Sequence, residues 1–71
     1  MGIKRINEYL LAFYDELGCY DEIRISPLQL RDIEFALNAI TRAPSEDGEY
    51  SRLFILYKDG TWDEIKLEKY K

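Results

Sequence analysis

The sequence contains no histidine and only one cysteine, Cys19, among its 71 residues. Histidine is the commonest general base and metal ligand, and a cysteine nucleophile usually needs a neighbouring histidine for activation. A lone cysteine forms no disulfide within the chain and is most often a small buried hydrophobic residue. We therefore predict a protein that is not an enzyme and that has no catalytic site, metal site or cofactor.

Glycine clusters and long apolar runs are also absent. The four glycines, at positions 2, 18, 48 and 60, are isolated, so no glycine-rich phosphate loop is present. The apolar run at residues 9–14 is far shorter than the ~20 residues of a membrane span. Two acidic residues end this run and no small-residue cleavage site follows, which argues against a signal peptide. We expect a cytoplasmic protein without a membrane partner.

Basic residues are outnumbered, with ten lysines and arginines against fourteen aspartates and glutamates, which gives a net charge of −4. Binding to a phosphate backbone depends on basic side chains, so this balance disfavours nucleic acid as a partner. Hydrophobic residues make up 46% of the chain and charged residues 34%, as in a folded globule. We expect residues 1–71 to form one small domain whose single core is only just sufficient.

Hydrophobic spacing predicts two amphipathic helices. In residues 3–17, Ile3, Ile6, Leu10, Phe13 and Leu17 recur at intervals of three and four, and Gly18 suits the left-handed position after a helix. In residues 27–42, an apolar stripe follows a Ser-Pro-Leu-Gln start that is typical of a capped helix, and a proline at position 44 closes it.

The charges at the ends of the first predicted helix oppose its macrodipole. Lys4 and Arg5 lie in the first turn, whereas Asp15 and Glu16 lie in the last. Each such charge destabilises an exposed helix end by about 0.3–1 kcal/mol. Surface charges of this kind usually contribute little, so we retain the helix interpretation.

Strand signals occur at residues 20–25, which alternate in polarity, and at residues 50–70, where two β-prone runs flank Asp59-Gly60. The hairpin has two possible registers. A two-residue loop pairs Tyr57 with Trp62, whereas a loop of residues 58–60 with a bulge at the glycine pairs Leu56 with Trp62 and Leu53 with Ile65. In both registers residues 53–57 are apolar on both faces, which is typical of a central or doubly covered strand.

These elements predict an α+β fold with a C-terminal β-hairpin, in which two amphipathic helices pack on a small antiparallel sheet in the order helix-strand-helix-strand-strand. Residues 43–49 form the polar loop before the hairpin. We expect the short strand at 20–25 to lie beside the second hairpin strand, parallel to the first.

The aromatic content suggests a function. The chain has six tyrosines, three phenylalanines and one tryptophan, more rings than so small a core can bury. Tyrosine and tryptophan are enriched at protein interfaces. We therefore expect a protein-protein interaction module, either a homodimer or an adaptor or inhibitor of a larger protein. The candidate partner-binding residues are Phe35, Tyr50, Leu53, Ile55, Tyr57, Trp62 and Tyr70.

An alternative interpretation is an acidic mimic of nucleic acid, which would inhibit a DNA- or RNA-binding protein by occupying its basic groove. It requires carboxylates arranged on one face like a row of phosphates. The net charge of −4 is modest for such a role. The candidate residues are Asp15, Glu16, Asp21, Glu22, Asp63 and Glu64.

Overall fold

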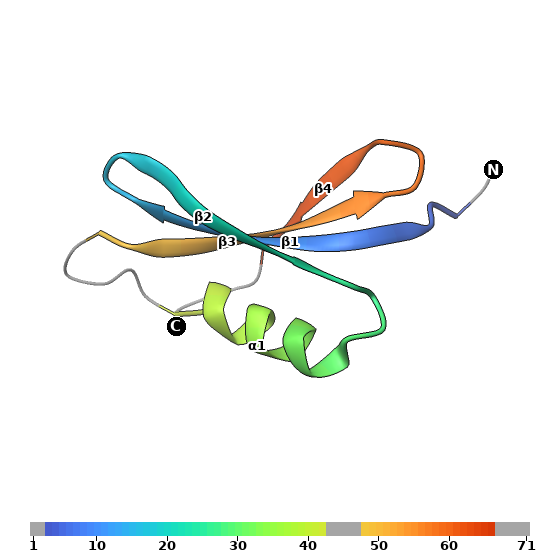
Figure 1. Ribbon diagram of the computed structural model, residues 1–71, viewed down its shortest axis with the longest axis horizontal. Coiled ribbons are helices and arrows are strands. Elements are labelled where there is room, and N and C mark those ends of the chain that lie inside the picture. The colour runs from blue at the N-terminus through green and yellow to red at the C-terminus, as the bar shows by residue number, and fades with distance from the viewer. Residues whose placement is uncertain (1–2, 43–47, 67–71) are drawn as a thin grey trace.

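A computed structural model describes residues 3–42 and 48–66, which form four strands and one helix. In chain order these are β1 (Ile6–Asp15), β2 (Gly18–Ile25), α1 (Leu30–Ile40), β3 (Tyr50–Tyr57) and β4 (Trp62–Ile65). The strands form one antiparallel sheet in the order β2-β1-β3-β4. The helix lies on one side of the sheet (Figure 1). The described residues therefore form two layers, a sheet and one helix.

The helix predicted for residues 3–17 is wrong, because residues 6–15 form strand β1. Residues 9–14 are apolar at every position, so apolar residues at helical spacing occur there in any case. An unbroken apolar run of this kind fits a helix and a strand buried on both faces equally well. β1 pairs with β2 on one side and with β3 on the other. A central strand of this kind is expected to be apolar on both faces.

The turn between β1 and β2 uses the residues that had suggested a helix end. Asp15 pairs with Gly18, and the Asp15 carboxylate accepts a hydrogen bond of 2.8 Å from the Leu17 backbone N–H. Gly18 has a φ of 117°, in the left-handed region that both a tight turn and a helix terminus require. The glycine alone therefore did not distinguish the two structures. The macrodipole conflict disappears because no helix is present here.

The predicted strand at 20–25 exists within β2, but its neighbour is β1 rather than the last strand. The predicted helix-strand-helix-strand-strand order, with two helices on the sheet, is therefore wrong. The described residues follow the order strand-strand-helix-strand-strand. Because residues 6–15 join the sheet, they occupy its centre and separate β2 from β3. The predicted direction of β2 is confirmed, because β2 and β3 are both antiparallel to β1 and therefore run parallel to each other.

The second predicted helix is confirmed as α1, which begins at Leu30 rather than at position 27. The Gln29 side chain accepts a hydrogen bond of 2.9 Å from the Ser26 backbone N–H, and the Ser26 hydroxyl accepts one of 3.2 Å from Leu28 N–H. These reciprocal bonds resemble a capping box, but they stabilise a turn just before the helix. Residues 43–47, which include the predicted closing proline and most of the predicted loop, lie outside the described residues.

The core lies between α1 and the sheet. Leu11 and Leu53, in the two central strands, have no exposed surface, and Ala36 of α1 is equally buried against them. A small residue at this position of the helix allows its backbone to approach the sheet closely. The core cluster consists of Leu11, Ile25, Ala36, Ile40 and Leu53.

The second hairpin adopts the longer-loop register. Leu53 pairs with Ile65 and Leu56 with Trp62, so the alternative pairing of Tyr57 with Trp62 is excluded. The Tyr57 backbone N–H donates to the Thr61 carbonyl at 2.8 Å, which closes a loop of residues 58–60. Gly60 has a φ of 89°, as expected for a glycine bulge at the end of a three-residue loop. The part of the hairpin predicted beyond position 66 lies outside the described residues.

The loop contains a pH-sensitive carboxylate, Asp59. Its Oδ1 accepts hydrogen bonds from the Thr61 hydroxyl at 2.5 Å and from the Thr61 backbone N–H at 2.9 Å. The bond from the hydroxyl, followed by the backbone bond, lowers the pKa of Asp59 below its ordinary value. An unfolded chain therefore binds this proton more readily than the folded one. The stability that Asp59 contributes is present above about pH 4 and is lost as the pH falls through the folded-state pKa.

We expect Asp59→Asn to reduce the loss of stability between about pH 4 and pH 2, because asparagine keeps an acceptor oxygen but does not titrate there. Urea unfolding of both proteins across this pH range measures the effect. An identical pH dependence in the two proteins would show that the turn does not lower the pKa of Asp59.

Candidate functional site

The side of the sheet opposite α1 carries many apolar side chains and is uncovered by any described element (Figure 1). Paired residues of adjacent strands share a face, and Leu11 and Leu53 face the helix. Their neighbours Leu10 and Phe54, which pair with each other, therefore face the other way. We call this surface the open face. Its central and aromatic residues are Leu10, Ala12, Tyr14, Tyr50, Arg52, Phe54, Leu56 and Trp62.

Trp62 is the most exposed large hydrophobic residue of the open face. It leaves 61% of its surface accessible and lies edge-on to the ring of Phe54, with centroids 5.6 Å apart and planes at 78°. Together with Leu10 and Leu56 these rings line an open, shallow depression of about 350 Å³, at which Arg52 also lies. Such a pairing of rings holds Trp62 in one orientation while leaving most of it free for contact.

Arg52 connects the two aromatic groups of the open face. Its guanidinium donates two hydrogen bonds to the Glu64 carboxylate, at 2.9 and 2.7 Å, and lies 5.2 Å from the ring centre of Phe54 and 5.5 Å from that of Tyr14. The bidentate bond raises the pKa of Arg52 further above its ordinary value. The arginine is thus held over the rings as a flat, fixed cation.

Beyond Arg52, the rings of Tyr14 and Tyr50 stack with centroids 5.2 Å apart and planes at 9°. On the β2 side of the sheet, Arg24 forms an ion pair with Glu8. The open face is therefore a pre-ordered aromatic surface, in which each of these charged groups has its partner. Rigid rings and arginine are common in the surfaces through which proteins bind one another.

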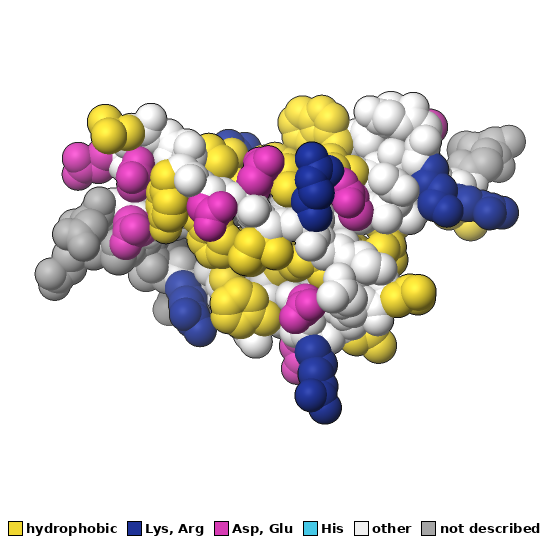
Figure 2. All heavy atoms as spheres, viewed as in Figure 1, with side chains coloured by type: hydrophobic (Ala, Val, Ile, Leu, Met, Phe, Trp, Pro, Cys, Tyr) yellow, Lys and Arg dark blue, Asp and Glu magenta, His cyan; other side chains and the backbone are white. Residues whose placement is uncertain are grey.

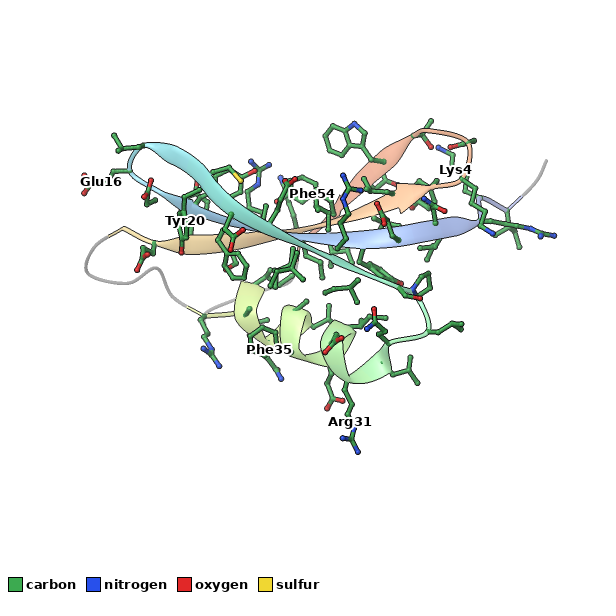
Figure 3. All side chains as sticks on the ribbon, viewed as in Figure 1. Lys4, Glu16, Tyr20, Arg31, Phe35 and Phe54 are labelled. Carbon is green, nitrogen blue, oxygen red and sulfur yellow. The ribbon has the colours of Figure 1, made fainter. Side chains whose placement is uncertain are left out.

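Charge is distributed unequally along the molecule, whose longest extent is 43 Å. Figure 3 places Lys4 and Glu16 at opposite ends of the long axis. Figure 2 shows Asp and Glu side chains gathered toward the end with the β1-β2 turn, and Lys and Arg side chains at the end near the N-terminus. The acidic end contains Asp15, Glu16, Asp21, Glu22 and Glu49 together with Arg42, and the basic end contains Lys4, Arg5 and Lys58 together with Asp59.

The predicted partner-binding residues do not share one surface. Leu53 is completely buried, and Ile55 pairs with Tyr9 on the side of the sheet that faces α1. The Tyr57 hydroxyl donates a hydrogen bond of 2.8 Å to Asp63, which raises the pKa of the phenol. These residues lie in the core or beside it, because alternation along β3 sends odd-numbered side chains toward the helix.

Two other predicted residues, Trp62 and Tyr50, lie on the open face. Phe35 projects from α1 with 55% of its surface exposed (Figure 3). Phe35 and Tyr50 both line a second hollow, of about 230 Å³, beside the end of α1. Tyr70 lies outside the described residues.

The six predicted acidic residues are divided. Asp15, Glu16 and the β2 residues Asp21 and Glu22 gather toward one end, but Asp21 and Glu22 are adjacent in a strand and point to opposite faces. On β4, Glu64 is bound by Arg52 and Asp63 by Tyr57. The arrangement resembles an acidic end of the molecule rather than a row of phosphates.

The cysteine is exposed in the structure, so the interpretation of Cys19 as a buried hydrophobic residue is wrong. Its thiol lies 3.4 Å from the Asp21 carbonyl oxygen, to which it donates a weak hydrogen bond. In residues 3–42 and 48–66, no three histidine, cysteine or acidic side chains are grouped as metal ligands would be. The one helix of these segments is too short and too polar to cross a membrane.

Sequence reasoning missed several residues of the open face, above all Leu10, Tyr14 and Arg52. The assignment of residues 3–17 to a helix placed the first two on the wrong kind of surface. The available signal was the apolar run at residues 9–14, which matches that of residues 53–57 and predicts a second doubly apolar strand. Comparisons with known protein families, curated proteins and solved structures give no significant match.

Proposed function

We propose that this protein is a small non-catalytic protein-protein interaction module that binds its partner through the open face. The observation that supports the proposal is the ordered aromatic surface on the side of the sheet that lacks a helix, with Trp62 61% exposed at its edge. Exposure of a cluster of rings and leucines to water is unfavourable in free energy, and such surfaces commonly mark interaction sites.

The side chains of this face are already ordered before a partner binds. Phe54 and Tyr14 are partly buried and held by Arg52, so little side-chain entropy remains to be lost when a partner covers them. The paired charges of Arg52 and Glu64 supply a polar element that remains satisfied during binding. The proposed role requires no further catalytic or cofactor-binding group.

A comparison of Trp62→Glu with Phe35→Glu tests the proposal. Both substitutions replace a highly exposed ring by a carboxylate, but Trp62 lies on the open face and Phe35 on the helix. We expect wild type and Phe35→Glu, when immobilised, to retain a protein partner that Trp62→Glu retains at least about tenfold less. The candidate partners are proteins of the source cell and the purified domain itself.

The single tryptophan provides a second measurement, because its emission shifts to shorter wavelength when Trp62 is covered. Two results together would contradict the proposal. Wild type, Trp62→Glu and Phe35→Glu would retain the same partners equally, and the emission of wild type would be unchanged when those partners are added.

A further inference from the structure

The distribution of charge along the open face indicates which partner it binds. We infer that the partner is a second copy of this chain, packed face to face with its strands antiparallel to those of the first, so that the acidic end of each copy meets the basic end of the other. This inference rests on the proposed function, because it assumes that the open face is a binding surface.

Symmetry leaves two simple ways to pack the open face against itself. A twofold axis along the strands places like ends together, whereas a twofold axis across the strands reverses the second copy and places unlike ends together. In the first arrangement the acidic ends of the two copies meet, and so do their basic ends. In the second arrangement the acidic end of each copy faces the basic end of the other. Electrostatic complementarity therefore selects the second.

The centre of this arrangement coincides with the apolar centre of the face. Leu10 lies midway along β1 between Arg5 and Asp15, and it pairs with Phe54 of β3. A twofold axis near this pair brings the two oppositely charged ends into register and places Phe54 of one copy over Phe54 of the other. Two sheets packed in this way lie about 10 Å apart, with their inward side chains interleaved.

The sheet edges are less suited to self-association than the open face. The outer strand β2 contains three charged residues, Asp21, Glu22 and Arg24, and β4 has only four residues. Charged and short edge strands resist pairing with another chain. The apolar surface that remains uncovered among the described residues is on the face, not on the edges.

The size of the face predicts a weak dimer. Four strands are about 19 Å wide at ~4.8 Å each, and β1 from position 6 to 14 is about 27 Å long at ~3.3 Å per residue. Each copy therefore offers about 500 Å², and the pair about 1,000 Å², at the low end of specific interfaces. We expect a dissociation constant in the micromolar range.

Light scattering during size exclusion at several concentrations tests the inference on the full chain. We expect wild type to approach twice its monomer mass of 8.5 kDa as its concentration rises to about 500 µM. Trp62→Glu buries one carboxylate from each copy against the apolar face, so we expect it to raise the dissociation constant at least about tenfold. Phe35→Glu, which makes the same change in charge on the helix, should leave the constant unchanged.

Charge variants test the orientation. Glu16→Lys/Glu22→Lys removes most of the negative charge of the acidic end, where Asp15, Asp21 and Glu49 remain, and Arg5→Glu/Lys58→Glu makes the basic end acidic; these four side chains are exposed. In low salt we expect each double variant alone to dimerise about fivefold more weakly than wild type, because the attraction between unlike ends is weakened or reversed. An equimolar mixture of the two should recover dimerisation.

A wild-type protein that stays monomeric over the whole concentration range overturns the inference. If a different protein is nevertheless retained in a Trp62-dependent manner, the proposed function survives that result. A dimer that Phe35→Glu dissociates and Trp62→Glu does not would also overturn the inference. Double charge variants that dimerise as strongly as wild type would exclude the antiparallel arrangement.

Discussion

Leu53→Ala is expected to reduce the free energy of unfolding by about 2–5 kcal/mol, the range found when a buried leucine is truncated and the cavity only partly closes. Leu53 has no exposed surface and lies in the core beneath α1. A domain of 71 residues has about 4–10 kcal/mol of stability in total. The substitution therefore removes a large part of it, and we expect the melting temperature to fall by at least about 10 °C.

Leu56→Ala is the matched control, because the same truncation is made in the same strand on the opposite face. Leu56 is only partly buried and pairs with Trp62 on the open face. In dilute protein, where self-association contributes nothing, we expect a loss of about 1 kcal/mol, as for a side chain that water already reaches. Urea unfolding of the two variants measures the difference. Equal losses would mean that the core does not lie between β3 and the helix.

Ala36→Asp is expected to unfold the domain at neutral pH. Ala36 is completely buried where α1 meets the sheet, with Leu11 and Leu53 in the same cluster and no charged residue among its members. Burial of an unpaired carboxylate costs several kcal/mol, which approaches the whole stability of the domain. Circular dichroism at pH 7 measures the loss of strand and helix signal.

Phe35→Asp is the control for Ala36→Asp, since it introduces the same residue one position earlier in the same helix. Phe35 is 55% exposed, so the new carboxylate remains in water and we expect the protein to stay folded. Burial raises the pKa of an aspartate at position 36, so the folded state binds its proton more readily than the unfolded state. Ala36→Asp should consequently regain stability as the pH falls toward about 5, whereas Phe35→Asp should not. A folded Ala36→Asp protein at pH 7 would contradict the packing of α1 described above.

The sequence was most informative where local chemistry alone determines structure. Asp59-Gly60 between two β-prone runs predicted the second hairpin, because a glycine at positive φ is required at such a turn. The start at Ser26 and the apolar stripe of α1 predicted one helix, within three residues at its beginning. The doubly apolar run at residues 53–57 predicted a strand in the middle of a sheet, and β3 is such a strand.

Prediction failed at residues 6–15, where local signals were ambiguous. Tyr9 to Tyr14 satisfy the period of a helix and that of a doubly buried strand equally well, and Gly18 suits the end of either. One signal did favour the strand: Lys4, Arg5, Asp15 and Glu16 opposed the macrodipole of a helix at both ends. A single charge of this kind contributes little, but four concordant ones together disfavour a helix.

The sequence by itself determined that the chain forms a folded domain with both helix and strand, and that it contains a hairpin, in one of two registers, after a helix within residues 27–42. It also determined an excess of aromatic rings over what a small core needs. Only the tertiary structure decided that residues 6–15 form the central strand, which hairpin register holds, and which rings share a face. These are questions of long-range pairing, and shifting a strand by one residue exchanges its buried and exposed side chains without altering any local preference. The open face exists because one helix covers one side of a sheet whose central strands are apolar on both.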